Sequence, residues 1–246
     1  MATYNGMKYL PAQITSILKQ LASDDEVVIQ DDGSSDGTVA YLMSLGDPRV
    51  LVEVNPGNRG VITTFERALK RARGEIVFLS DQDDVWLPGK VAHVLAEFSR
   101  PEVMAVVTDA EIIDASEKVV VPSYHQAYGG RAGVWKNFWR NSYLGCCLAF
   151  RREVLQPGLD IPKSVRTHDG WLGLVSNMVG EVVFLDKILL KYRRHGGNAS
   201  QMHRFGWPDV IKRRLALAGH MIRVYPSVRL TRKQLQRRTL AGGKHL

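Results

Sequence analysis

A dense group of carboxylates in this sequence has the composition of a metal site. Asp81 and Asp83, with a third aspartate beside them, come directly after the apolar run 75–79, which is typical of a buried strand in a parallel sheet. Carboxylates at this spacing repel one another unless a cation lies between them, and Mg²⁺ or Mn²⁺ would relieve that repulsion while also binding phosphate oxygens. Taken alone, the group is better explained as an acidic turn before the helix that starts at Pro88, because such turns are common.

A second pair of carboxylates changes that balance. Asp31 and Asp32 follow the apolar run 27–29 and open a turn rich in Gly, Ser and Asp. This turn could simply cap the next helix through Ser35 or Asp36. Packing gives no reason for two buried strands to end in paired aspartates at one edge of a sheet, whereas a site for a ribose, a base and a metal-bound diphosphate does. In open α/β sheets, ligands bind just beyond the carboxyl ends of the strands, where both pairs fall.

Strand-like and helix-like segments alternate through the first hundred residues. This order predicts an α/β protein with βαβ units and a mostly parallel sheet flanked by helices. Residues 1–6 look like a strand-to-helix loop with no strand before it, so we expect the first strand to be missing and the start to be truncated or misassigned. The expected helices are 7–21, 38–45, 60–73, 88–98 and 167–179, and the expected strands are 26–30, 50–54, 75–79, 103–108, 144–150 and 181–190.

Length and composition exclude several classes of protein. The chain has 246 residues, 45% of them hydrophobic, which is enough for one sizeable core and an appendage. Its two cysteines, Cys146 and Cys147, are adjacent, so they neither cross-link a secreted fold nor offer metal-ligand spacing. No apolar run approaches the roughly 18 residues of a membrane span, and no signal-peptide pattern opens the chain. We therefore predict a cytoplasmic protein.

Charge is distributed unevenly along the chain. Residues 187–246 carry a net charge of +14 and residues 1–186 carry −6, within a total of +8. Such asymmetry directs the tail to a polyanion, either an anionic membrane surface or a nucleic acid.

We expect a domain over residues 1–200 and a basic, amphipathic helical tail over residues 201–246. The tail would contain one helix over 207–225 and a shorter one over 231–240. Basic amphipathic helices often lie on anionic membranes, which is the reading we favour, with peripheral attachment at the cytoplasmic face. A helix packed back on the domain is the alternative.

Seven motifs, in order, resemble those of the family 2 glycosyltransferases, most closely the rhamnosyltransferase-like branch that builds bacterial surface polysaccharides. The resemblance covers about residues 1–200, and although each motif alone is weak, seven in sequence are specific. The motifs are ATYNG (2–6), DDGSSDGT (31–38), NRG (58–60), SDQDDVW (80–86), GCCLAFRR (145–152), HDGWL (168–172) and YRRHGGN (192–198).

This resemblance implies a GT-A fold and the transfer of a sugar, rhamnose in the branch named, from a nucleotide diphosphate sugar with inversion at the anomeric carbon. The acceptor would be a hydroxyl of a glycan, lipid-linked in surface-polysaccharide synthesis. The resemblance also assigns roles to residues. The nucleotide sugar would be held by Thr3, Tyr4, Asn5, Asp31, Asp32, Asn58, Gly60 and Asp81, and Mg²⁺ or Mn²⁺ by Asp81, Asp83 and His195.

The motif at residues 168–172 carries the implied catalytic base. From the pattern alone, Thr167 or Asp169 would be the N-cap of a helix. In the resembled family this aspartate is the base, and the chemistry agrees, because an acceptor hydroxyl must lose its proton as it attacks. We expect His168 to orient Asp169.

Three segments keep two interpretations each. The aromatic-rich stretch 119–141 could stack on sugar rings or pack under a long connection. Arg151 and Arg152 could face a diphosphate or end a solvated strand. His195 could approach the metal or belong to a basic surface loop.

Two other functions remain to be compared. A sugar-nucleotide nucleotidyltransferase would share the sheet and the metal but needs a Gly-rich, basic loop after its first strand, which residues 5–8 do not supply. A nucleic-acid-binding protein would explain the basic tail but leaves the aspartates without a role, so we expect no nucleic-acid partner.

Overall fold

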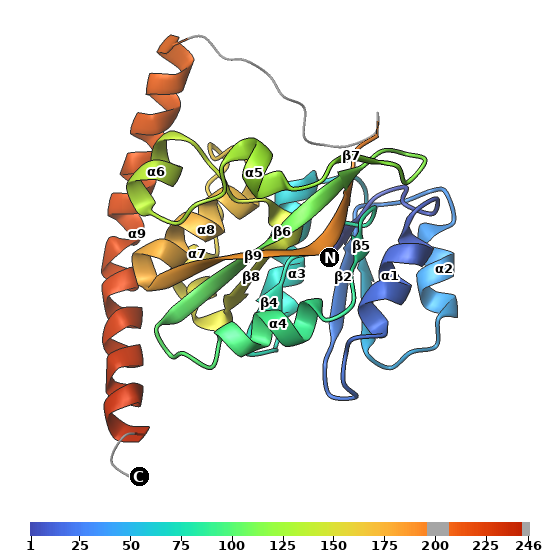
Figure 1. Ribbon diagram of the computed structural model, residues 1–246, viewed down its shortest axis with the longest axis horizontal. Coiled ribbons are helices and arrows are strands. Elements are labelled where there is room, and N and C mark those ends of the chain that lie inside the picture. The colour runs from blue at the N-terminus through green and yellow to red at the C-terminus, as the bar shows by residue number, and fades with distance from the viewer. Residues whose placement is uncertain (196–206, 243–246) are drawn as a thin grey trace.

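The computed structural model describes residues 1–195 and 207–242 as two β-sheets with helices packed around them (Figure 1). The first sheet is parallel and contains β1 (Ala2–Thr3), β2 (Val27–Asp31) and β3 (Val50–Val54) in that order. Both β1 and β2 end where the polar motifs begin. The α/β class expected from the alternating pattern is confirmed.

The first strand is present, although it is only two residues long. Ala2 pairs with Gln30 and Thr3 pairs with Asp31, and the Gln30 N–H donates to the Met1 carbonyl over 3.0 Å. The expectation that this strand is missing was therefore wrong: residues assigned to a loop begin as a strand. Two residues are too few to show the period-two apolar pattern by which strands are identified.

The second sheet combines parallel and antiparallel pairs. Its order is β4-β8-β6-β9-β5, with β7 paired to β6. The long strands β6 and β9 are parallel, and β8 lies antiparallel between β4 and β6. The strands are β4 (Ile76–Phe78), β5 (Val85–Trp86), β6 (Val103–Ile113), β7 (Val119–Val121), β8 (Leu148–Arg151) and β9 (Glu181–Arg193).

The strand that precedes the carboxylate group lies at an edge of this sheet. We expected 75–79 in the middle of a parallel sheet, but β4 pairs antiparallel with β8, with Val77 opposite Phe150. Among the described residues, the other edge of β4 has no strand partner. An apolar run indicates burial on both faces, but it does not identify the neighbouring strand, which here comes about 70 residues later in the chain.

Helices cover both sheets. In Figure 1, α1 and α2 lie beside the first sheet, and α9 runs along the opposite side of the molecule. The expected helices before residue 100 all form, with ends no more than three residues inside the expected bounds. The α-helices are α1 (Leu10–Leu18), α2 (Thr38–Ser44), α3 (Val61–Arg71), α4 (Lys90–Glu97), α5 (Tyr124–Tyr128), α6 (Val134–Trp139), α7 (Leu155–Gly158), α8 (His168–Val179) and α9 (Trp207–Gly242), and the 3₁₀ turns are η1 (Gly145–Cys147) and η2 (Arg152–Val154).

The basic tail forms one helix, where we expected two. α9 continues through Pro226, a residue that removes a backbone donor and normally bends or ends a helix. Packing after the proline offsets that cost: Val228 and Thr231 are fully buried, and the Arg232 Nε donates to the Val179 carbonyl over 3.2 Å. One face of α9 thus packs back on α7 and α8.

Other apolar side chains of α9 are exposed, among them Leu215 and Ile222. Within residues 1–195 and 207–242, none of the helices is both long and apolar enough to cross a bilayer. The boundary expected at residue 200 lies outside the described residues.

Candidate active site

Loops from both sheets are joined by hydrogen bonds at the carboxyl ends of β1, β2 and β4. The Gln82 side chain bonds twice to the Tyr4 backbone: Tyr4 N–H donates to Gln82 Oε1 over 2.8 Å, and Gln82 Nε2 donates to the Tyr4 carbonyl over 3.0 Å. Asn5 N–H donates to Ser34 Oγ over 2.8 Å. The motifs at residues 2–6, 31–38 and 80–86, far apart in the sequence, therefore form one surface.

Asp31 organises the turn after β2. Its carboxylate is fully buried and accepts hydrogen bonds from Thr3 Oγ1 at 2.7 Å, Ser34 Oγ at 2.6 Å, Ser34 N–H at 2.7 Å and Gly33 N–H at 3.0 Å. Gly33 has a φ of 83°, a left-handed conformation that favours glycine. Asp31 and Thr3 thus shape the floor of the site, and their direct contact with a nucleoside stays a prediction.

Asp32 fastens a third loop to this surface. Its Oδ1 accepts from Asn55 Nδ2 and from Arg59 N–H, both at 2.8 Å, and its Oδ2 accepts from Gly60 N–H at 2.9 Å. Burial alone would raise the pKa of Asp32, but the hydrogen bonds from Arg59, Asn55, Thr64 and Gly60 hold that pKa below its usual value. The loop that carries Asn58 and Gly60 is therefore held at the site by a charged acceptor.

The negative charges of Asp83 and Asp169 both act on Asp81. Burial, and then the negative charges of Asp83 and Asp169, raise the pKa of Asp81 to about 7. Asp169 lies in the first turn of α8, and Thr167 is the N-cap, with its Oγ1 accepting from Gly170 N–H at 3.3 Å. Two segments almost 90 residues apart thus bring acids to one place, and a cation between Asp81 and Asp83 would relieve the repulsion.

Asp169 is held closely by its neighbours. Its Oδ1 accepts from Gly170 N–H at 2.6 Å, and a Cβ placed on Gly145 would lie only 3.3 Å from its Oδ2. A side chain at position 145 would therefore crowd the carboxylate. Tyr124 of α5 also lies near: burial, and then the negative charge of Asp169, raise the pKa of Tyr124 to about 12.

The end of β9 reaches the same place. His195 Nε2 lies 2.9 Å from Asp83 Oδ2, and the charge of Asp83 acts in turn on Asp81. A shared metal site of these three residues stays a prediction. Burial raises the pKa of Asp83, and the bond to His195 partly opposes that rise. The remainder of the motif, residues 196–198, lies outside the described residues.

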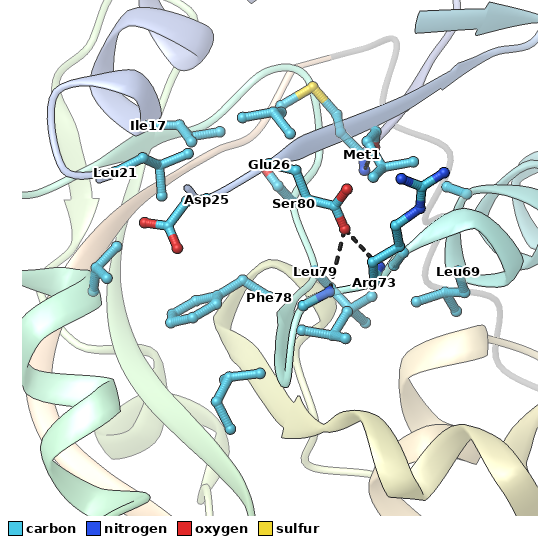
Figure 2. Close-up of a pocket in the computed structure, with 18 of the residues that line it drawn as sticks. Met1, Ile17, Leu21, Asp25, Glu26, Leu69, Arg73, Phe78, Leu79 and Ser80 are labelled. Atoms are coloured by element: carbon cyan, nitrogen blue, oxygen red, sulfur yellow. Dashed lines mark hydrogen bonds between the residues drawn. The ribbon is translucent and has the colours of Figure 1, made fainter. Parts of the chain in front are cut away.

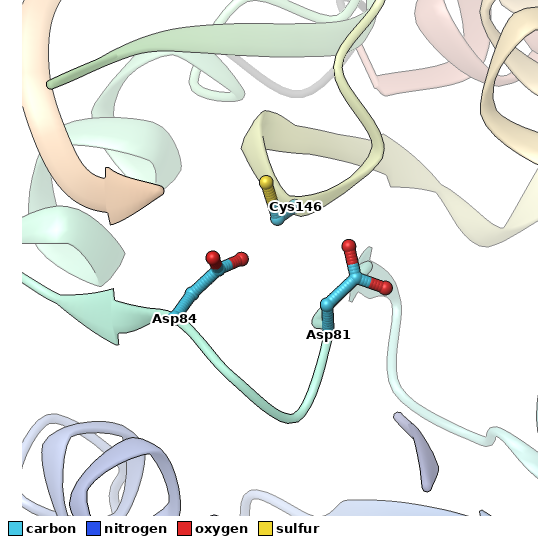
Figure 3. A group of neighbouring side chains, drawn as sticks. All are labelled: Asp81, Asp84 and Cys146. Atoms are coloured by element: carbon cyan, nitrogen blue, oxygen red, sulfur yellow. The ribbon is translucent and has the colours of Figure 1, made fainter. Parts of the chain in front are cut away.

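A different trio of possible ligands lies beside this group. Figure 3 shows Asp81, Asp84 and Cys146, whose ligand atoms lie within 4.8 Å of one another. Burial raises the pKa of the Cys146 thiol well above its usual value, so the sulfur keeps its proton. Burial and the charges of Asp83 and Asp81 likewise raise the pKa of Asp84.

Mg²⁺ and Mn²⁺ prefer oxygen ligands to a protonated thiol. The carboxylates around Asp81 therefore fit such an ion better than the Cys146 sulfur does. Asp83 and His195 as its ligands stay a prediction.

Sequence reasoning missed three residues that hold the carboxylate loop. Gln13 of α1 is fully buried, and its Nε2 donates to Ser80 Oγ at 2.8 Å and to the Asp81 carbonyl at 3.0 Å. Gln82 makes the two bonds to Tyr4 described above. Arg193, 2% exposed, donates from Nε to the Asp83 carbonyl over 2.9 Å. A signal existed for Gln13, which interrupts the apolar stripe of its helix.

The remaining candidate residues from the sequence differ in whether they lie at the acids. The His168 ring stacks on Phe65 with centroids 3.9 Å apart, and its Nε2 makes no hydrogen bond within the described residues, so no contact shows it orienting Asp169. Arg151 faces neither a diphosphate nor solvent: its guanidinium donates to backbone carbonyls, Val103 over 2.9 Å and Phe98 over 2.5 Å. In the aromatic-rich stretch, α5 approaches the acids, while Trp135 of α6 is 78% exposed.

Comparison with known proteins decides the family. The model of "Glycosyl transferase family 2" matches residues 1–159, which include the three linked loops and most of the second sheet. The chain belongs to glycosyl transferase family 2. The family 2 transferase is 30% identical over 207 residues to an uncharacterized glycosyltransferase of Nostoc, with 80% of this chain and 64% of that protein covered.

A second relative has a more specific name. The transferase is 29% identical over 161 residues to an Escherichia coli UDP-Glc:alpha-D-GlcNAc-diphosphoundecaprenol beta-1,3-glucosyltransferase, with 64% of this chain and 60% of that protein covered. The chain thus spans somewhat less than two thirds of the length of these two relatives.

Solved structures share the fold. Staphylococcus aureus TarS in complex with UDP-GlcNAc superimposes with a TM-score of 0.72 at 18% identity, over 98% of this chain and 71% of that one. A mannosyltransferase of Pyrobaculum calidifontis, in complex with GDP-Man and Mn²⁺, gives a TM-score of 0.62 at 17% identity, over 100% and 74%. The GT-A architecture implied by the motifs is therefore confirmed.

Replacing Asp32 tests its role in fastening the Asn58 loop. Because its pKa is lowered on folding, ionised Asp32 stabilises the protein above its unfolded pKa near 3.8, and this contribution is lost as pH falls through the lower folded value. We expect Asp32→Asn to lower the free energy of unfolding by about 1–3 kcal/mol at pH 7. The difference from the wild type should shrink below about pH 4, measured by denaturant unfolding across pH.

The exposed Asp24→Asn serves as the control and should unfold like the wild type. A loss of stability in Asp32→Asn that stays the same at pH 3 and pH 7 would contradict a charged role.

The two possible ligand sets can be separated by Mn²⁺ binding. We expect Asp83→Asn to weaken Mn²⁺ binding by more than about tenfold and His195→Ala to weaken it less, because an ionised carboxylate is the harder ligand. Cys146→Ser should leave binding unchanged. Titration followed by electron paramagnetic resonance of free Mn²⁺ measures all three variants, and a large loss in Cys146→Ser with none in Asp83→Asn would reverse the assignment.

Proposed function

We propose that this family 2 glycosyltransferase moves a sugar from a nucleotide diphosphate sugar to an acceptor hydroxyl, with inversion and with the help of Mg²⁺ or Mn²⁺. One observation carries the proposal: Asp81 lies close enough to both Asp83 and Asp169 for their charges to raise its pKa. This proximity supports a donor site at Asp81 with Asp169 as the candidate base. Two adjacent but independent acidic turns would not need this costly arrangement.

The nucleotide end of the donor belongs to the loops after β1 and β2. Tyr4 has an exposed ring, with its backbone fixed by Gln82, so the ring is free to lie against a base. Asn5 is held through Ser34, and the loop of Asn58 and Gly60 is held through Asp32. These contacts support the assignment of Thr3, Tyr4, Asn5, Asp31, Asp32, Asn58, Gly60 and Asp81 to the nucleotide sugar.

The chemistry that follows is a single displacement. Asp169 takes the proton of the acceptor hydroxyl as its oxygen forms a bond to the anomeric carbon, and the bond from that carbon to the diphosphate oxygen breaks. Attack and departure on opposite faces of the sugar give inversion. Gly170 N–H holds one carboxylate oxygen of Asp169, which leaves the other, beside Gly145, for the proton. A bound divalent ion would supply positive charge against the departing diphosphate.

The acceptor and the donor sugar are further proposals. The Escherichia coli relative is named for a diphosphoundecaprenol-linked acceptor, which supports a lipid-linked glycan acceptor in polysaccharide synthesis here. Rhamnose as the transferred sugar rests on the motif resemblance alone, since that relative is named for glucose. Screening nucleotide sugars for metal-dependent thermal stabilisation would identify the donor.

A membrane surface is the partner that we propose for α9. Ile211, Leu215 and Ile222 are 53%, 69% and 74% exposed, and their spacing of four and seven residues places them on one side of the helix. The helix is also rich in Lys and Arg, with Asp209 in its first turn. Apolar side chains flanked by bases suit the interface of an anionic bilayer.

Replacing the base tests the reaction. We expect Asp169→Asn to lower the transfer rate by roughly 10²–10⁴-fold and to keep the affinity for nucleoside diphosphate, because the amide cannot accept the proton. Rates come from release of nucleoside diphosphate, and affinity comes from calorimetry. Asp160→Asn, which alters an exposed carboxylate elsewhere, is the matched control. Turnover of Asp169→Asn comparable to the wild type would refute the assignment, and release of pyrophosphate would favour a nucleotidyltransferase.

Replacing the exposed apolar residues tests the membrane proposal. We expect the triple variant Ile211→Ser, Leu215→Ser, Ile222→Ser to reduce binding to anionic vesicles by roughly fivefold or more, because the buried face of α9 is untouched while the insertable side chains are gone. Sedimentation with phosphatidylglycerol vesicles measures the bound fraction. Met43→Ser, at a residue 60% exposed on α2, controls for general surface polarity. Equal sedimentation of the triple variant and the wild type would rule out this docking face.

A further inference from the structure

Helix α6 carries two exposed tryptophans that the proposed reaction does not use. Trp135 and Trp139 are four residues apart, so their rings lie on one side of the helix, and they are 78% and 62% exposed. Asn137 and Phe138, on other sides of the helix, are buried. Large apolar side chains that share an exposed face are typical of an interaction surface, because water solvates them poorly.

Helix α9 is fastened beside these tryptophans (Figure 1). Arg214 Nη2 donates to the Trp139 carbonyl over 2.7 Å, and the guanidinium carbon lies 5.9 Å from the centre of the Phe138 ring. At 3.6 residues per turn, Ile211 and Leu215 lie within about 100° of Arg214 around α9. These exposed apolar side chains therefore border the side of α9 that contacts α6.

Positive charge accompanies the apolar side chains on both helices. Residues 118–152 contain six Lys or Arg and no Asp or Glu, and residues 210–242 contain nine Lys or Arg and again no acid. Near the tryptophans, burial and then the positive charges of Arg131 and Arg140 lower the pKa of Lys136. The cations beside α6 thus repel one another, and an anionic surface would relieve that repulsion.

We propose that α6 and the adjoining part of α9 form one surface that docks on an anionic bilayer, with Trp135 and Trp139 among the lipid headgroups. Tryptophan suits that depth, because its ring is apolar and carries one N–H donor. Lys136 and Arg140 each follow a tryptophan, so their long side chains can reach lipid phosphates at the edge of the same face. This inference rests on the membrane partner proposed for α9 and adds a second helix to it.

Docking through α6 bears on the reaction as well. α6 packs against α8, and Asn141, two residues after α6, lies against the first turn of α8: a Cβ placed on Gly170 would meet Asn141 Nδ2 at 3.1 Å. That turn carries Asp169. α6 therefore connects the docking surface to the candidate base, which suits an acceptor whose lipid anchor stays in the bilayer.

Brominated lipids test whether α6 enters the bilayer, without relying on glycosyl transfer. The full chain is mixed with phosphatidylglycerol vesicles whose acyl chains carry bromine, which quenches tryptophan fluorescence only at short range. We expect the double variant Trp135→Phe, Trp139→Phe to keep roughly half or more of the vesicle binding, because Phe is also apolar. It should lose more than about half of the quenching, because Trp86 and Trp171 are buried in the core.

A polar pair of substitutions tests the contribution of the same residues to binding. Trp135→Ser, Trp139→Ser should lower the affinity for these vesicles by roughly fivefold or more and leave the melting temperature unchanged, because both side chains are exposed. The matched control is Met43→Ser, Leu95→Ser, at exposed apolar residues of α2 and α4, which should bind like the wild type. Quenching of the Phe variant equal to the wild type, or full binding of the Trp135→Ser, Trp139→Ser variant, would show that α6 does not dock.

Other outcomes separate this inference from the proposals on which it rests. If binding falls in Ile211→Ser, Leu215→Ser, Ile222→Ser but not in the tryptophan variants, α9 docks alone and the inference is wrong. A wild-type dimer that Trp135→Ser, Trp139→Ser dissociates, measured by light scattering, would assign the surface to a second copy of the chain. Weaker binding of a soluble glycan with unchanged vesicle binding would assign the tryptophans to sugar. A failed transferase assay would leave the vesicle results as they are.

Discussion

Mutual repulsion among buried carboxylates is the constraint around which this molecule is arranged. Asp81, Asp83 and Asp84 lie within four residues, and Asp169 adds a fourth negative charge from α8. Withdrawal from water makes that repulsion stronger, so these acids can stay together only where cationic groups and hydrogen-bond donors surround them. The end of β9 supplies such groups: the Arg193 N–H donates to Asp84 Oδ1 at 3.0 Å, and His195 lies against Asp83.

The positions of Arg193 and His195 depend on the second sheet. β9 is 13 residues long and pairs with β6 over most of its length, so its end has a fixed position relative to the carboxylate loop. Arg193 is held further by Glu117, whose Oε1 accepts from Nη2 at 2.8 Å, and by the Tyr9 ring, 4.8 Å from the guanidinium carbon. The pairing of β9 and the contacts of the Arg193 side chain thus place one positive group near several negative ones.

Much of this arrangement could be predicted from local pattern, and the remainder could not, for physical reasons. Regular elements such as α3 and β3 follow from apolar periodicity, and the Asp81 and Asp169 motifs followed from resemblance. The neighbour of β4 was missed because strand pairing depends on contacts far apart in the sequence. Gln13 interrupts the apolar stripe of its helix, but the sequence does not show what its amide contacts, and only the fold shows that it bonds to the Asp81 carbonyl.

The candidate active site lies across the boundary between the two sheets, so its geometry depends on how the sheets are held together. Tyr4 follows β1 of the first sheet, yet its backbone is positioned by Gln82 of the second. Asp31 and Asp32 belong to the first sheet, whereas Asp81, Asp83 and Asp169 belong to the second or to helices packed on it. The nucleoside loops and the acids therefore keep their spacing only while the sheets keep theirs. A cavity lies between β2 and β4 (Figure 2). The Gln82 contacts and the bonds that Glu26 accepts from backbone N–H groups just before β4 help to hold that spacing, together with the Gln13 bonds from α1. These hydrogen bonds therefore contribute to the geometry of the active site as well as to stability.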